Sequence, residues 1–85
     1  MKEFVYTIRD ENGIHARPAG MLVKLVKGFG GSVTVHAGDK QCDMKRLMAL
    51  MGLGIKQGGE IRVCVEGEGE EAMAAELEKF LRENL

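Results

Sequence analysis

The chain has 85 residues, of which 45% are hydrophobic and 29% are charged, and its formal net charge is −1. This length holds one domain, and this composition excludes a disordered chain, which has less apolar content, and a membrane protein, which has fewer charges. No apolar run has the length of a signal peptide or a bilayer span, so we expect a cytoplasmic protein that binds no membrane. The near-neutral charge argues against a nucleic-acid partner.

The first half of the chain alternates between strand and helix patterns. Apolar residues at every second position predict a strand over residues 4–9, and a polar turn follows at residues 10–13. Over residues 16–27, apolar side chains recur with the spacing i, i+3, i+4 and i+7, which is typical of one helix face. Two short strands follow, around residues 33–35 and 40–42, with a hairpin turn between them.

The second half predicts a short helix over residues 45–53, a strand over residues 61–65 and a long helix over residues 70–84. Glu70 and Glu71 lie near the positive end of that last helix. The order β-α-β-β-α-β-α predicts an α+β fold, a two-layer open-faced sandwich whose four-stranded antiparallel sheet carries three helices on one face. We expect residues 1–85 to form this single domain.

The cysteines and histidines do not have the spacing of a metal site. His15, His36, Cys42 and Cys64 match no zinc pattern, so we expect no metal. We expect both cysteines to be free thiols of a reducing compartment, although the sequence leaves a disulfide between them open. His36 lies between two apolar residues of a strand and should point away from the core.

A seven-residue segment, Gly13 to Ala19, contains the most informative pattern. The chain's only proline, Pro18, falls in the first turn of the 16–27 helix, where a missing N–H costs nothing. His15 then lies at or next to the helix N-cap, beside unpaired backbone N–H groups and the positive end of the dipole. That field disfavours the imidazolium, so His15 should stay neutral and nucleophilic.

A phosphoryl group on His15 is the chemistry that this position suits best. The amides of Ala16 and Arg17, together with the Arg17 guanidinium, could hold three phosphoryl oxygens. General-base catalysis has less support, because no carboxylate is near in sequence to orient the ring and no Ser or Cys nucleophile is close by. A histidine that only caps the helix is the alternative that the residues alone leave open.

The sequence Gly13-Ile14-His15-Ala16-Arg17-Pro18-Ala19 resembles the active-site motif of HPr, the histidine-containing phosphocarrier of the phosphoenolpyruvate-dependent sugar phosphotransferase system. The resemblance covers the whole chain, with further matching stretches at residues 48–55 and 58–61. In that family the motif histidine takes a phosphoryl group on Nδ1 from phosphorylated enzyme I and passes it to the IIA domain of a sugar permease.

Carried onto this chain, the resemblance implies that His15 is the phosphoryl carrier and Arg17 its electrostatic partner. Ala16 would contribute a backbone amide, and Pro18 would shape the helix start. The chain would then be a covalent carrier, a substrate of phosphotransferase enzymes and not an enzyme itself, and it would need no cofactor. A shuttle of this kind is expected to be a monomer.

The sequence departs from the family at the start of the 45–53 helix. Many members carry a serine there, which an ATP-dependent kinase phosphorylates for catabolite control. The matching position here is Arg46, and the chain's only serine, Ser32, lies elsewhere. We therefore expect no serine switch. Arg46 would instead contact acidic partners or remain solvated.

Two short helices have outward faces that are more apolar than solvent exposure requires. Methionine suits a surface that meets several partners, and a basic rim, which includes Lys45, would steer acidic ones. We expect Met21 and Met48 to be at least partly exposed, and Met73 to belong to the core. The expected partner-binding residues are Gly20, Met21, Lys24, Lys27, Arg46, Leu47, Met48 and Met51.

Three other functions remain as alternatives. A phosphocarrier of the nitrogen-linked branch would keep the same histidine, and the sequence does not separate the branches. A regulatory adaptor of the same fold is expected to lose the histidine, which this chain retains. A small acylphosphatase-like hydrolase would need a catalytic Arg and Asn at a phosphate loop, and Asn12 and Asn84 are poorly placed for that role.

Overall fold

The computed structural model describes all 85 residues and contains seven elements. In chain order they are β1 (Lys2–Thr7), α1 (Ala16–Lys27), β2 (Ser32–Ala37), β3 (Lys40–Asp43), α2 (Leu47–Gly52), β4 (Glu60–Glu66) and α3 (Glu70–Asn84). The predicted order β-α-β-β-α-β-α is confirmed.

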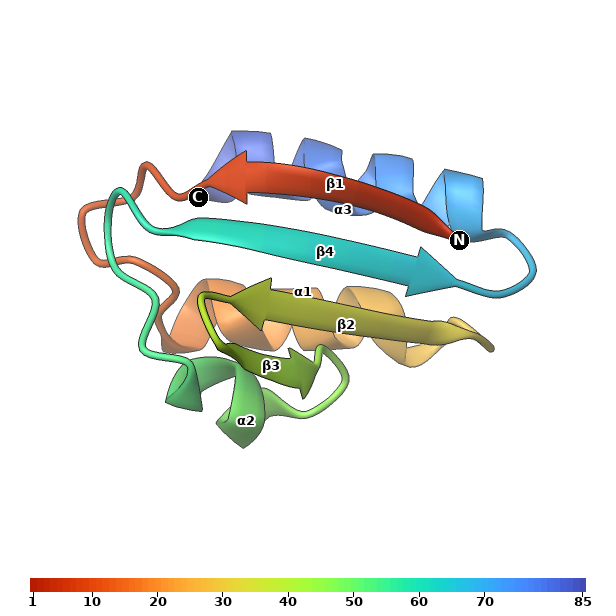
Figure 1. The fold of residues 1–85 in the computed structure, drawn as a ribbon, viewed down its shortest axis with the longest axis horizontal. Coiled ribbons are helices and arrows are strands. Elements are labelled where there is room, and N and C mark those ends of the chain that lie inside the picture. Colours follow the sequence, from red (N-terminus) through yellow and green to blue (C-terminus); the bar gives the residue numbers. More distant parts are fainter.

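The four strands form one antiparallel sheet in the order β1-β4-β2-β3. The first strand therefore pairs with the last, in a register that runs from Lys2 opposite Val65 to Thr7 opposite Glu60. Helices α1 and α3 lie behind the sheet, and α2 lies beside β3 near the start of α1 (Figure 1). The predicted α+β open-faced sandwich is confirmed. No helix is both long and apolar enough to cross a bilayer.

The core lies between the sheet and the helices, as the alternating patterns require. Along β4, Ile61, Val63 and Val65 are buried while their neighbours face outward. Leu22 of α1 and Leu77 of α3 are completely buried against this face. The removal of these apolar side chains from water supplies most of the force that holds the two layers together. Met73, expected in the core, is half-buried and packs against its edge.

Two element boundaries differ from the predicted ones. The first strand lies two residues earlier than expected. Its regular pairing with β4 ends at Thr7, because the carbonyl of Ile8 then accepts the N–H of Gly58 at 2.8 Å and the N–H of Arg9 donates to the backbone oxygen of Leu85 at 2.6 Å. The short helix begins at Leu47 and not at Lys45. The Asp43 carboxylate accepts the N–H of Lys45 at 2.9 Å and holds this residue in a turn before the helix.

Lys45 also does not contribute to a basic rim, and this part of the expectation is wrong. Its Nζ donates to the carbonyl oxygens of Phe29 at 2.7 Å and Gly31 at 2.9 Å. The ammonium therefore satisfies carbonyl groups of the loop between α1 and β2.

The two cysteines lie on opposite faces of the sheet. Cys42 pairs with the buried Val35, on the helix side, whereas Cys64 pairs with Thr34 on the open side. Both thiols are free, and this arrangement excludes a disulfide between them. Partial burial raises the pKa of each thiol, and the neighbouring carboxylate of Glu3 raises the pKa of Cys64 further. His36 lies on the open side, away from the core as predicted.

Candidate functional site

Helix α1 begins at a histidine and has no side-chain cap. His15 is the N-cap, with extended backbone angles (φ −112°, ψ 177°), and its carbonyl accepts the N–H of Ala19 at 3.0 Å. Pro18, buried in the first turn, has no N–H to satisfy. The N–H groups of Ala16 and Arg17 donate to no protein atom. The helix therefore begins with free donors at its positive end.

The loop that delivers His15 is held by the backbone before β4. The N–H of Ile14 donates to the carbonyl oxygen of Ile55 at 3.0 Å. Gly13 has φ +66°, and a Cβ at this residue would overlap that same oxygen and lie 2.7 Å from the Cα of Lys56. Only glycine fits there, for reasons of both conformation and space. The position of His15 is thus fixed from outside α1.

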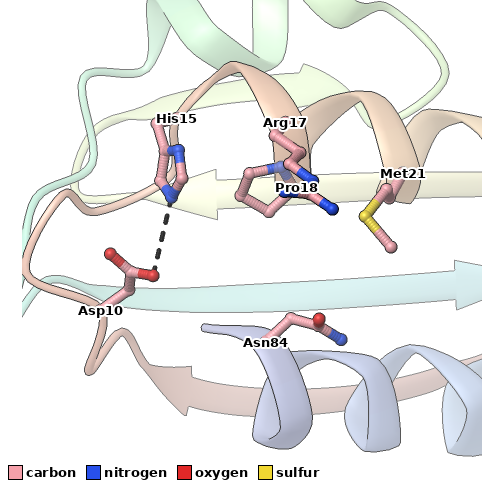
Figure 2. Close-up of a pocket in the computed structure, with 6 residues that line it drawn as sticks. All are labelled: Asp10, His15, Arg17, Pro18, Met21 and Asn84. Carbon is pink, nitrogen blue, oxygen red and sulfur yellow. Dashed lines mark ion pairs between the residues drawn. The ribbon is translucent and has the colours of Figure 1, made fainter.

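An open depression of about 230 Å³ surrounds the imidazole. Figure 2 shows that its lining comes from three segments: the turn after β1, the first two turns of α1 and the end of α3. The His15 side chain is 40% exposed, so a protein partner can reach the ring. The lining residues are Asp10, His15, Arg17, Pro18, Met21 and Asn84.

A carboxylate lies beside the ring, so the expectation that none is near is wrong. Oδ2 of Asp10 is 3.6 Å from Nε2 of His15, and the two groups face each other across the depression (Figure 2). Asp10 precedes His15 by five residues, and the turn over residues 10–13 folds its carboxylate back toward the ring. The only signal in the sequence was the turn itself, which we had interpreted as a connection.

Asn84 also lines the depression, although sequence reasoning set it aside. It comes from the last turn of α3, where its Nδ2 donates to the carbonyl of Phe80 at 3.0 Å. Asn84 therefore lies in the same depression as Arg17, contrary to the argument that it is poorly placed. Its amide nitrogen already has a partner within α3. Asn12 does not line the depression.

The methionines of the expected partner surface are exposed, as predicted. Met21 is 45% exposed and Met48 is 79% exposed, while Leu47 and Met51 also lie at the surface. Gly20 is half-buried on α1, and Lys24, Lys27 and Arg46 are exposed.

These residues do not form one patch on one side of α1. Met21 and Lys24 line a groove between α1 and α3, together with Leu25 and Phe80. Leu47, Met48 and Met51 lie on α2, which contacts α1 from its other side. Exposed apolar side chains therefore flank the histidine end of α1 on both sides.

Arg46 occupies a position in α2 that corresponds to that of His15 in α1. It is the N-cap residue, with φ −107° and ψ 103°, and no side chain caps the helix. Its guanidinium is exposed and forms no ion pair within the chain. Nowhere do three His, Cys, Asp or Glu side chains converge as metal ligands would.

Comparison with known proteins gives one consistent family. A family model described as "PTS HPr component phosphorylation site" matches residues 2–83. The phosphocarrier protein HPr of Lysinibacillus sphaericus is 37% identical over 83 residues, which are 98% of this chain and 94% of that protein.

Solved structures agree with this match. A structure of HPr from Thermoanaerobacter tengcongensis superposes with a TM-score of 0.91 at 32% identity, covering 96% of this chain and 92% of that one. The histidine-containing phosphocarrier protein of Mycoplasma superposes with a TM-score of 0.90 at 32% identity, covering 93% and 90% of the two chains.

Proposed function

The chain belongs to the HPr family, and we propose that it carries phosphoryl groups on His15, from phosphorylated enzyme I to IIA domains of sugar permeases. The observation that supports this proposal most directly is the start of α1. An exposed imidazole stands there beside two free backbone N–H groups and a guanidinium, in a depression open to a protein partner.

The proposed transfer uses one nitrogen of the ring. The lone pair of Nδ1 attacks the phosphorus held by enzyme I, so that one N–P bond forms on His15 while the bond to the donor breaks. The free N–H groups of Ala16 and Arg17 and the Arg17 guanidinium accommodate the three phosphoryl oxygens. The second transfer reverses these steps, and the electron pair returns to Nδ1.

The openness of the site fits a carrier that does not turn over a substrate of its own. An enzyme that transfers phosphoryl groups surrounds the reacting atoms and excludes water. The depression around His15 is too open for that, so the missing walls would come from the partner protein. We therefore regard the chain as a substrate and intermediate of phosphotransferase enzymes.

Apolar side chains on both sides of α1 support a docking surface of two parts. Met21 lies on the α3 side, and Leu47, Met48 and Met51 lie on α2. Flexible thioethers adapt to different partner surfaces, which suits a protein that meets both a donor and an acceptor. The exposed cations Lys24, Lys27 and Arg46 would favour acidic partners, and the half-buried Gly20 belongs to the same docking surface on α1.

We also propose that the chain lacks regulation by a serine kinase. Arg46 stands at the N-cap of α2, where many relatives have the phosphorylated serine. Its free guanidinium would extend the basic surface toward acidic partners.

We propose further that residues 1–85 act as a single, monomeric carrier domain in the cytoplasm. Two structural relatives are described as dimers, an HPr from Thermoanaerobacter tengcongensis and the Crh protein of Bacillus subtilis, the latter with a swapped domain. A shuttle that presents its histidine to successive partners works best when that end of α1 stays free.

Labelling with radioactive phosphoenolpyruvate tests the proposal. Enzyme I of the sugar branch should transfer label to the wild-type chain as an acid-labile adduct, and His15→Ala should take up none. His36→Ala, which removes the other histidine, is the matched control and should label like wild type. Equal labelling of His15→Ala and wild type would contradict the carrier function. Label transferred only by the enzyme I of the nitrogen branch would assign the chain to that branch.

A further inference from the structure

We propose that Asp10 is a positioning residue for His15. Its carboxylate holds the ring in the tautomer that carries hydrogen on Nε2, and so leaves the lone pair of Nδ1 for phosphorus. This inference rests on the proposed function, because it concerns how Nδ1 of His15 is kept unprotonated for phosphoryl transfer.

The two carboxylate oxygens of Asp10 face different groups. Oδ1 accepts the backbone N–H of Asn12 at 2.8 Å, which closes the turn after β1. Oδ2, the other oxygen, is the one that faces Nε2 of His15 at 3.6 Å. The carboxylate therefore cannot rotate away from the ring without loss of its bond to Asn12.

The backbone of Asp10 is also fixed. Its N–H donates to the backbone oxygen of Leu85 at 2.9 Å, and its carbonyl accepts the N–H of Gly13 at 2.9 Å. Asp10 thus stands on a short turn tied at both ends, so its carboxylate is a stable reference point for the ring.

No other charged group competes for this carboxylate. His15 is the only ion-pair partner of Asp10, whereas Arg17 and Asn84 line the other parts of the depression. A separation of 3.6 Å is longer than a hydrogen bond. Because the His15 side chain is 40% exposed, a small rotation can close the gap when a partner docks, as hydrogen bonds of reactive groups often tighten in the complex.

A partner for one ring nitrogen decides the chemistry of the other. A neutral imidazole has one N–H and one lone pair, and a carboxylate can only accept. An N–H directed at Asp10 must be on Nε2, which leaves Nδ1 unprotonated. When the N–P bond forms, positive charge develops on the ring, and the carboxylate stabilises it against the field of the α1 terminus. The proton stays on Nε2 during both transfers.

The substitution Asp10→Asn tests this role without removing the turn. The amide oxygen can still accept the N–H of Asn12, so the amide nitrogen, a donor, would face Nε2. The favoured tautomer should therefore reverse, with hydrogen on Nδ1. The matched control is Glu11→Gln, which neutralises an exposed neighbouring carboxylate that forms no ion pair.

Two measurements decide the outcome. The ¹⁵N chemical shifts of the His15 ring nitrogens, taken where the ring is neutral, should show hydrogen on Nε2 in wild type and in Glu11→Gln, and on Nδ1 in Asp10→Asn. The rate of labelling from enzyme I should fall about 10–100-fold in Asp10→Asn only. Unchanged nitrogen shifts, or a labelling rate equal to that of Glu11→Gln, would overturn the role of Asp10. Absence of labelling in every protein, wild type included, would instead overturn the proposed function, while the shifts would still decide whether Asp10 sets the tautomer.

Discussion

Helices α1 and α3 pack side by side against one sheet, yet their first turns are built in opposite ways. The first turn of α3 contains two acidic residues, and Oε1 of Glu70 accepts the N–H of Gly67 at 3.1 Å. The first turn of α1 contains no acidic residue and includes Arg17, and neither helix has a side-chain N-cap bond, so the two ends differ in charge and not in capping. The start of α3 therefore has negative charge that offsets its positive end, whereas the start of α1 beside His15 has none, which suits the anionic phosphoryl group of the proposed function.

The open start of α1 has a cost in stability. An uncapped N-terminus forgoes about 1 kcal/mol relative to one with a good N-cap residue. Burial of Pro18, Ala19, Leu22 and Val26 against the core offsets this cost, since the helix is held by its apolar face. The comparison teaches that α1 is held by its buried apolar face and not by its first turn, where the proposed function places the phosphoryl group.

Of the variants that test this comparison, His15→Ser should have the largest effect, because it gives α1 a side-chain N-cap and removes the imidazole. Serine is a favoured N-cap residue, so His15→Ser should raise the free energy of unfolding by about 1 kcal/mol. The same change removes the imidazole, so labelling from enzyme I should be lost completely. Urea denaturation and the labelling assay measure the two effects. If His15→Ser is no more stable than wild type, the missing side-chain cap at the start of α1 costs no stability.

Replacement of Gly13 by alanine tests whether the backbone at Ile55 and Lys56 positions the loop that leads into α1. The added Cβ overlaps the carbonyl oxygen of Ile55 and requires φ near +66°, so Gly13→Ala should cost roughly 2–4 kcal/mol in unfolding free energy. Denaturant titration measures the loss.

The control for this change is Gly20→Ala, in the middle of α1. A Cβ at Gly20 meets no atom within 4 Å, so this variant should be more stable than wild type by about 0.5–1 kcal/mol. Equal stabilities of the two variants would contradict the fixed path of the loop before His15.

The smallest expected effect lies at α3. The amino group of Met1, 2.7 Å from Glu70, together with the N–H of Gly67, holds the pKa of Glu70 below its ordinary value of 4.5. A lowered carboxyl pKa stabilises the fold at pH values above 4.5, and this contribution is lost as the pH falls through the lower, folded pKa. Glu70→Gln should therefore lower the melting temperature slightly at neutral pH and not in strong acid.

Thermal melts from neutral pH down to about pH 3 measure this difference. Glu71→Gln removes a charge from the same turn without contacting Met1 or Gly67, so it should have the smaller effect at neutral pH. A larger effect of Glu71→Gln would show that the charge near the dipole matters more than the bonds of Glu70.

The sequence predicted α1 and α3 to the residue because their signals are local. The apolar spacing and Pro18 define α1, and Glu70 marks the start of α3. Arg46 likewise occupies the start of α2. The exposure of Met21 and Met48, which was predicted from an apolar, methionine-rich partner surface, is also confirmed.

What the sequence did not reveal depends on contacts between distant segments or on turn geometry. The carboxylate of Asp10 reaches His15 only because a turn of four residues reverses the chain, and Asn84 reaches the same depression from the end of α3. Lys45 is bound by carbonyls of Phe29 and Gly31, sixteen and fourteen residues away. Residue periodicity carries no information about such pairs.

The pairing of the first strand with the last has a consequence for biosynthesis. Strand β1 leaves the ribosome before its partner β4, which follows only after about fifty further residues, and such non-local pairing forms slowly. The backbone oxygen of Leu85 then accepts the N–H groups of Arg9 and Asp10, at 2.6 and 2.9 Å. A nascent or truncated chain without Leu85 lacks this anchor, so the turn beside His15 is fixed only in a chain that has been translated through that residue.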